Sequence, residues 1–157
     1  MTYQITGLSP DIATAFENAT DAELSSLRAA KMIATSKPGF PCRISLEDAE
    51  VGEEVLLFHH MSHDVDSPYR NGYAIFVRTG LSAAAHYTDA VPPVFKGRNL
   101  AMRAFGEDAM LKTAVLALPG EADEVIRRLF ELEAVAYIDV HNAAHGCFAA
   151  RVKRFES

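Results

Sequence analysis

Aliphatic and polar side chains alternate along two segments near the end of the chain. Every second residue of 137–141 is aliphatic, and an apolar alternation recurs across residues 147–152. Because successive side chains of a strand point to opposite faces, both segments fit strands with one buried face. A three-residue loop ending at Gly146 would pair Asp139 with Arg151 and bring the two apolar faces together. The pattern therefore predicts a C-terminal β-hairpin.

This register also makes a prediction about side-chain chemistry at the turn. It pairs Ala143 with Cys147 and places His141 diagonally beside Cys147, with about 7–8 Å between their backbones. Longer side chains can cross that distance. A thiol and an imidazole are therefore expected to be neighbours at the end of the hairpin.

Start signals elsewhere predict helices. Ser9 precedes Pro10, a pair typical of an N-cap followed by the first helical position. Thr20 and Glu23 have the spacing of a capping box. A third helix is expected from Glu121, with acidic residues in its first turn and an apolar stripe. Apolar runs predict further strands at residues 3–8, 31–35, 54–58, 73–78, 99–105 and 110–118.

These elements together predict the α+β class. A chain of 157 residues suits one domain, so residues 1–157 are expected to form a single domain. We expect a mainly antiparallel β-sheet with two or three helices packed against it and a C-terminal β-hairpin.

Composition and charge exclude several classes of protein. The formal net charge of -6 opposes nucleic-acid binding, which needs a basic surface. No apolar run reaches the roughly 18 residues of a membrane span, so no membrane partner is expected. The N-terminus lacks the basic and apolar regions of a signal peptide, and we expect a cytoplasmic protein. In such a reducing compartment the two cysteines are expected to be free thiols.

Side chains suited to catalysis or ligand binding lie in three segments, residues 41–43, 59–70 and 141–147. The first follows a stiff stretch, because Pro38 and Pro41 each fix their own backbone φ. The second begins at the end of an apolar strand and continues into a loop, where function is common. The candidate catalytic residues are Cys42, His63, His141 and Cys147. The candidate ligand-binding residues are Arg43, Tyr69, Arg70 and Asn142.

If these segments converge, they could form an enzyme active site or a small-ligand site. A neighbouring imidazolium favours the thiolate form of a cysteine, which is the nucleophile. Arg43 or Arg70 could then hold an anionic small molecule, and Asn142 could donate to a developing oxyanion. The sequence names no cofactor and no substrate.

Two other functions fit the same residues. In the first, His63, His141 and the two cysteines bind a metal ion, although their spacing matches no zinc motif. In the second, the chain is a non-catalytic interaction module or a homo-oligomeric structural protein. The polar groups would then serve turns and packing, and no well-formed cavity is expected.

Three motifs in the same order resemble a known family. They are Pro38-Gly39-Phe40-Pro41-Cys42-Arg43 with Ser45-Leu46, then Ser67-Pro68-Tyr69-Arg70 with Ile75-Phe76-Val77-Arg78, and then His141-Asn142 with Gly146-Cys147. From about Lys37 to Arg154 the chain resembles the bacterial domain of unknown function 1203. This resemblance implies a small, stand-alone bacterial protein, but it implies no activity and no catalytic residues.

Overall fold

Nine strands and three α-helices make up the chain in a computed structural model that describes residues 1–156. The strands are β1 (Thr2–Thr6), β2 (Ala30–Ile33), β3 (Glu54–His63), β4 (Asn71–Arg78), β5 (His86–Thr88), β6 (Leu100–Phe105), β7 (Leu111–Ala117), β8 (Tyr137–Asn142) and β9 (Phe148–Phe155). The helices are α1 (Thr14–Glu17), α2 (Asp21–Ser26) and α3 (Ala122–Phe130). The mixture confirms the α+β class.

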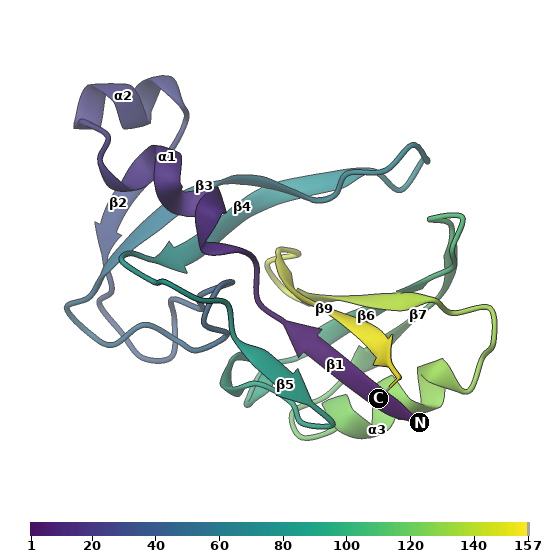
Figure 1. Cartoon of the computed structure of the whole chain (residues 1–157). Helices are drawn as coiled ribbons and strands as arrows, with labels where there is room; N and C mark the ends of the chain where they lie inside the picture. Colours follow the sequence, from purple (N-terminus) through teal and green to yellow (C-terminus); the bar gives the residue numbers. More distant parts are fainter. Residues whose placement is uncertain (157) are drawn as a thin grey trace.

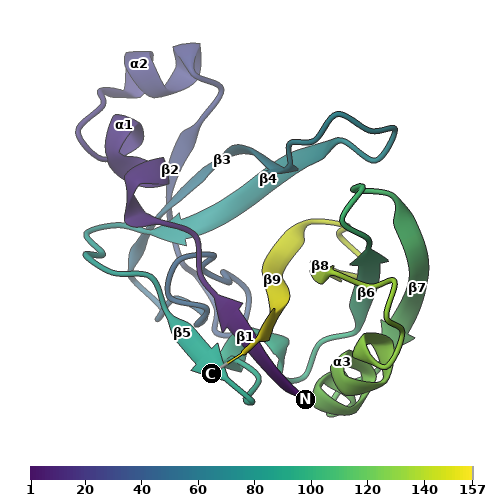
Figure 2. The same cartoon turned by 45° about the vertical axis from the view of Figure 1, so that its right-hand side comes forward.

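The strands form two antiparallel sheets. The larger has the order β5-β1-β9-β8-β6-β7, and the smaller has the order β2-β3-β4. Figure 1 shows the smaller sheet beside α1 and α2, with the larger sheet and α3 on the other side of the molecule. Figure 2 shows the larger sheet curving round toward α3. Among the described residues, no helix is long and apolar enough to cross a membrane.

Each sheet has its own apolar core. The larger core joins α3 to strands β1, β6, β8 and β9, and Ile126 of the helix and Ile138 of the sheet are both inaccessible to solvent. The acidic first turn of α3 contains Asp123 and Glu124, as expected for the positive end of a helix dipole. The smaller core lies between β3, β4 and α1, where Phe16 stacks on Phe58 with ring centroids 4.5 Å apart.

The C-terminal hairpin is confirmed, but its turn differs from the expected one. Asp139 pairs with Arg151 as predicted, and Gly146 has the expected positive φ of 78°. The N–H of Asn142 donates to the carbonyl of Cys147, so the loop has four residues instead of three. An extra residue then bulges out of β9, and His141 lies opposite Phe148.

Two other segments differ from the sequence prediction. Strand β3 was expected to end at residue 58 but continues to His63, because its pairing with β4 resumes after a bulge between His60 and His63. His63 is therefore a buried strand residue and not a loop residue. Strand β5 lies between residues 78 and 99, where no strand was predicted, and pairs with β1 at the sheet edge.

Candidate functional site

Arg43 is a buried guanidinium between the two sheets. Its backbone is held from both sides, since its N–H donates to Phe76 of β4 and its carbonyl accepts from Leu8 after β1. Only 2% of Arg43 is exposed. Its Nε donates to the carbonyl of Phe148 at 2.8 Å, and its Nη1 donates to the carbonyl of Pro41 at 2.5 Å. The side chain therefore connects the proline-rich segment to the start of β9.

The third contact of Arg43 is with the sulfur of Cys147. Arg43 Nη2 lies 3.1 Å from Cys147 Sγ, and Asn142 Nδ2 lies 3.3 Å from the same sulfur. Burial lowers the pKa of Arg43, and the contact with Cys147 acts in the opposite direction. The sulfur of Cys147 therefore accepts two hydrogen bonds, one of them from a cation.

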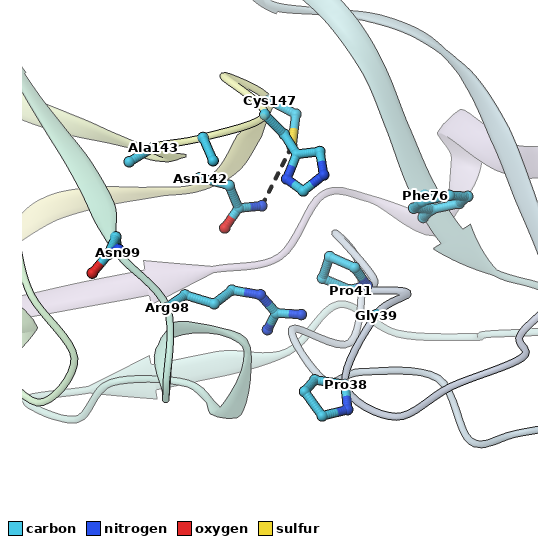
Figure 3. A pocket seen from close by; sticks show the side chains of 11 residues that line it. Pro38, Gly39, Pro41, Phe76, Arg98, Asn99, Asn142, Ala143 and Cys147 are labelled. Atoms are coloured by element: carbon cyan, nitrogen blue, oxygen red, sulfur yellow. Dashed lines mark hydrogen bonds between the residues drawn. The ribbon is translucent and has the colours of Figure 1, made fainter.

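Cys147 and Asn142 line a cavity of about 340 Å³, which we call the Cys147 cavity. Its other walls are formed by Pro38, Gly39, Pro41, Phe76, Arg98, Asn99, Ala143, Ala144 and His145. Figure 3 shows Cys147 and Asn142 on one side, with Arg98, Pro38 and Pro41 facing them. Arg98 is neutralised by Asp48, to which it donates two hydrogen bonds of 2.6 and 2.9 Å.

Among the described residues, one polar atom of Asn142 has no hydrogen-bond partner. Asn142 is 7% exposed, and its Nδ2 is used by Cys147. Within residues 1–156, its Oδ1 is buried and has no hydrogen-bond partner. A buried acceptor without a partner costs about 1–3 kcal/mol.

Cys42 lies outside this cavity. Its sulfur accepts from the backbone N–H groups of Ile44, Ser45 and Arg78 at 3.2–3.4 Å. Its side chain is 1% exposed and belongs to the apolar core of the smaller sheet. The thiol therefore closes a turn in the interior, although Arg43 next to it in sequence reaches the cavity wall through Cys147.

A second cavity, of about 330 Å³, lies on the other side of the hairpin end, and we call it the His141 cavity. It is lined by His63, Pro68, Tyr69, Arg70, Asn71, Arg103, Phe105, Leu111, Asp139 and His141. The two imidazoles expected to act in catalysis are therefore together, and Tyr69 and Arg70 lie beside them. Their cavity is not the one that contains the thiol.

Hydrogen bonds define which ring nitrogens of these histidines carry the proton. His63 Nδ1 lies 2.8 Å from the carbonyl of Tyr69, and His141 Nδ1 lies 2.9 Å from the carbonyl of Gly146. A carbonyl only accepts, so each Nδ1 is the donor and each Nε2 of a neutral ring is an acceptor. His63 Nε2 accordingly accepts from the hydroxyl of Tyr137 at 2.6 Å.

The charges beside His141 come from three residues. Burial lowers the pKa of His141, and the positive charge of Arg103 lowers it further. Asp139 acts in the other direction but is 0% exposed and binds Arg151 through two hydrogen bonds of 2.6 and 3.0 Å. His141 is therefore neutral near pH 7 and can accept a proton or a hydrogen bond through Nε2.

The structure thus brings seven of the eight predicted residues together in two adjoining groups, and Cys42 lies apart from both. Arg43, Asn142 and Cys147 form one, and the other contains His63, Tyr69, Arg70 and His141. The expected contact of His141 with Cys147 is replaced by Arg43 and Asn142 at the sulfur. No three His, Cys, Asp or Glu residues in the described part of the chain are placed to hold a metal ion.

Sequence reasoning missed Arg103, which lies next to His141 with Arg103 Nη1 3.5 Å from His141 Nε2. A signal was present in the alternation of β6, where the apolar residues Leu100, Met102 and Ala104 are buried and Arg103 takes the other face. The candidate residues were expected at turns and strand ends, and Arg103 lies within a strand.

The family comparison covers both groups of residues. A family model described as a protein of unknown function, DUF1203, matches residues 39–154. The chain belongs to the DUF1203 family. No curated protein and no solved structure matches the chain. The DUF1203 match begins after α1 and α2 and includes every residue named above from both cavities except Pro38.

Proposed function

We propose that this DUF1203 protein binds a small molecule in the Cys147 cavity and uses Cys147 as a nucleophile toward it. One observation supports this more than any other: the sulfur accepts hydrogen bonds from a buried guanidinium and from Asn142 at the wall of a cavity. A cation that is buried costs free energy unless a partner compensates it. A thiolate at Cys147 compensates Arg43 and is the reactive form of the thiol.

The residues that line the Cys147 cavity indicate the kind of ligand that fits it. The walls are mostly apolar, and the charged Arg98 is paired with Asp48. The cavity therefore suits a neutral, largely apolar molecule with an electrophilic carbon near the sulfur. In the reaction a C–S bond forms, and the pair of electrons from the bond that breaks leaves with the displaced group.

Arg43 has a different role from the one expected from sequence. Its Nε, Nη1 and Nη2 all donate to protein groups, and it lines neither cavity. It acts as a positioning residue that holds the sulfur and the two backbone segments in place. The nucleophile needs a reduced thiol, which is consistent with the two free cysteines and with the cytoplasm as its compartment.

Alkylation with iodoacetamide tests the proposal, because the sulfur then forms a C–S bond and iodide leaves. Cys42 serves as an internal control, since it is a buried thiol away from both cavities. In the native protein we expect Cys147 to react at least about tenfold faster than Cys42. Mass spectrometry of peptides containing each cysteine measures both rates in one sample.

A matched variant separates reactivity from simple access. Arg43→Lys keeps a positive charge but loses the fork of donors, so its Cys147 should react more slowly in a protein that remains folded. Equal rates for the two cysteines in the wild-type protein would overturn the proposal. So would a Cys147 rate that is unchanged in folded Arg43→Lys.

A further inference from the structure

Among residues 1–156, Arg103 has no carboxylate partner, and its guanidinium lies at the wall of the His141 cavity. It lies on β6 directly opposite Asp139 of β8. The carboxylate of Asp139, however, is used by Arg151 from the other neighbouring strand. None of the ion pairs found within residues 1–156 includes Arg103, and its side-chain contact is the one of 3.5 Å to His141.

The other charges around this cavity cancel. Asp139 is compensated by Arg151, and Arg70 is paired with Asp64 at 3.0 Å. The imidazoles of His63 and His141 donate through Nδ1 to backbone carbonyls, and burial together with the charge of Arg103 lowers the pKa of His141. One positive charge therefore remains, and it belongs to Arg103.

The remaining walls are apolar or aromatic. Phe105 packs against His63 with ring centroids 4.2 Å apart, and Tyr69 meets the edge of Phe105 at 6.0 Å. Leu111 and Pro68 also line the cavity. A cavity of about 330 Å³ with one guanidinium and an aromatic wall is large enough for a small organic molecule.

We propose that the His141 cavity binds a small carboxylate with an apolar or aromatic body, held by Arg103. The planar fork of a guanidinium matches the two oxygens of a carboxylate. One uncompensated positive charge suits one negative charge, which favours a carboxylate over a doubly charged phosphate. This site does not depend on the reactivity of Cys147.

Benzoate and benzamide provide the matched probes, because they have nearly the same shape and differ in charge. We expect benzoate to bind at least about tenfold more tightly than benzamide, as measured by titration calorimetry on the wild-type protein. NMR signals of the His63 and His141 rings should shift with benzoate at the same concentrations. Inorganic phosphate is the third probe, and we expect it to bind more weakly than benzoate.

Arg103→Gln tests the assigned residue, and Arg128→Gln, an exposed position of α3, is its control. Benzoate affinity should fall at least about tenfold in Arg103→Gln and stay unchanged in Arg128→Gln. Binding of benzoate, benzamide and phosphate to the wild-type protein tests the proposal even if Arg103→Gln fails to fold. Equal binding of benzoate and benzamide, tighter binding of phosphate, or shifts that leave both histidine rings unmoved would each overturn the proposal. Full benzoate affinity in folded Arg103→Gln would do the same.

Discussion

Arg43 Nη2 donates a hydrogen bond of 3.1 Å to Cys147 Sγ across 104 positions of the chain. The contact joins the segment between β2 and β3 of the smaller sheet to the residue directly before β9 of the larger sheet. It lies in the interior, where only 2% of Arg43 is exposed. The stability of the protein and the state of the thiol are therefore coupled through one side chain.

Arg43→Met should destabilise the fold strongly. The substitution leaves the carbonyls of Pro41 and Phe148 without their side-chain donor, in a buried region. Each buried acceptor without a partner costs about 1–3 kcal/mol, so we expect the free energy of unfolding to fall by about 3 kcal/mol. Urea unfolding followed by circular dichroism measures this loss. Arg128→Met, at an exposed position of α3, should change the free energy by less than about 0.5 kcal/mol.

Asp139→Asn tests the buried ion pair beside the His141 cavity. Asp139 is fully buried, and the variant leaves Arg151 without a compensating charge. Removing one partner of a buried pair costs about 3–5 kcal/mol, and we expect a loss of that size in urea unfolding.

A double variant and an exposed pair provide the controls for this loss. Asp139→Asn combined with Arg151→Met removes both charges and should recover part of the stability. Asp64→Asn breaks the exposed pair with Arg70, in which both side chains are more than half exposed, and should cost less than about 1 kcal/mol. Equal losses in Asp139→Asn and Asp64→Asn would contradict the role assigned to burial.

The hairpin was predictable because its signals are local. The alternation before the turn and the positive φ of Gly146 depend only on neighbouring residues. The bulge in β9 was not predictable from alternation, because Ala149 and Ala150 are both small and apolar and both fit the larger core. The bulge decides that His141 lies opposite Phe148, so the register around the thiol was wrong although the hairpin was right.

The candidate site was predictable only as far as its segments. The three segments carry the right chemical groups, and Arg43, Asn142 and Cys147 do meet. Which residue each of these side chains contacts depends on which of them are buried, and this follows from how the two sheets pack against each other. Cys42 shows this most clearly, because it is adjacent to Arg43 in sequence and yet turns into the core of the smaller sheet. Arg103 was missed because it lies within a strand and not at a turn.

Gly7→Ala should disturb the segment that supports Arg43. A Cβ atom at residue 7 would lie 2.0 Å from the backbone carbonyl oxygen of Ile44, which cannot move as a side chain can. Such overpacking against backbone costs about 3 kcal/mol, and we expect that loss in urea unfolding. At Gly52 a Cβ meets no atom within 4 Å. Gly52→Ala should therefore lose only about 1 kcal/mol of stability, from the backbone strain of its positive φ of 93°. Equal losses at the two positions would contradict the close approach at Gly7.

The pH dependence of stability should report on His141. Burial lowers the pKa of His141 from the ordinary 6.5, with Arg103 and His63 acting in the same direction and Asp139 and the Gly146 carbonyl opposing them. Below about pH 6.5 the unfolded chain binds a proton at this residue and the folded protein does not, so stability falls as the pH falls.

In His141→Asn this part of the slope, at most about 1.4 kcal/mol per pH unit, should disappear, while the amide can still donate to Gly146. Urea unfolding of both proteins between pH 5 and 7.5 measures the difference, and because His60 is present in both, its own lowered pKa cancels. Parallel slopes in the two proteins would show that the imidazole is not kept neutral by its surroundings, and the charge assignment of the His141 cavity would then be wrong.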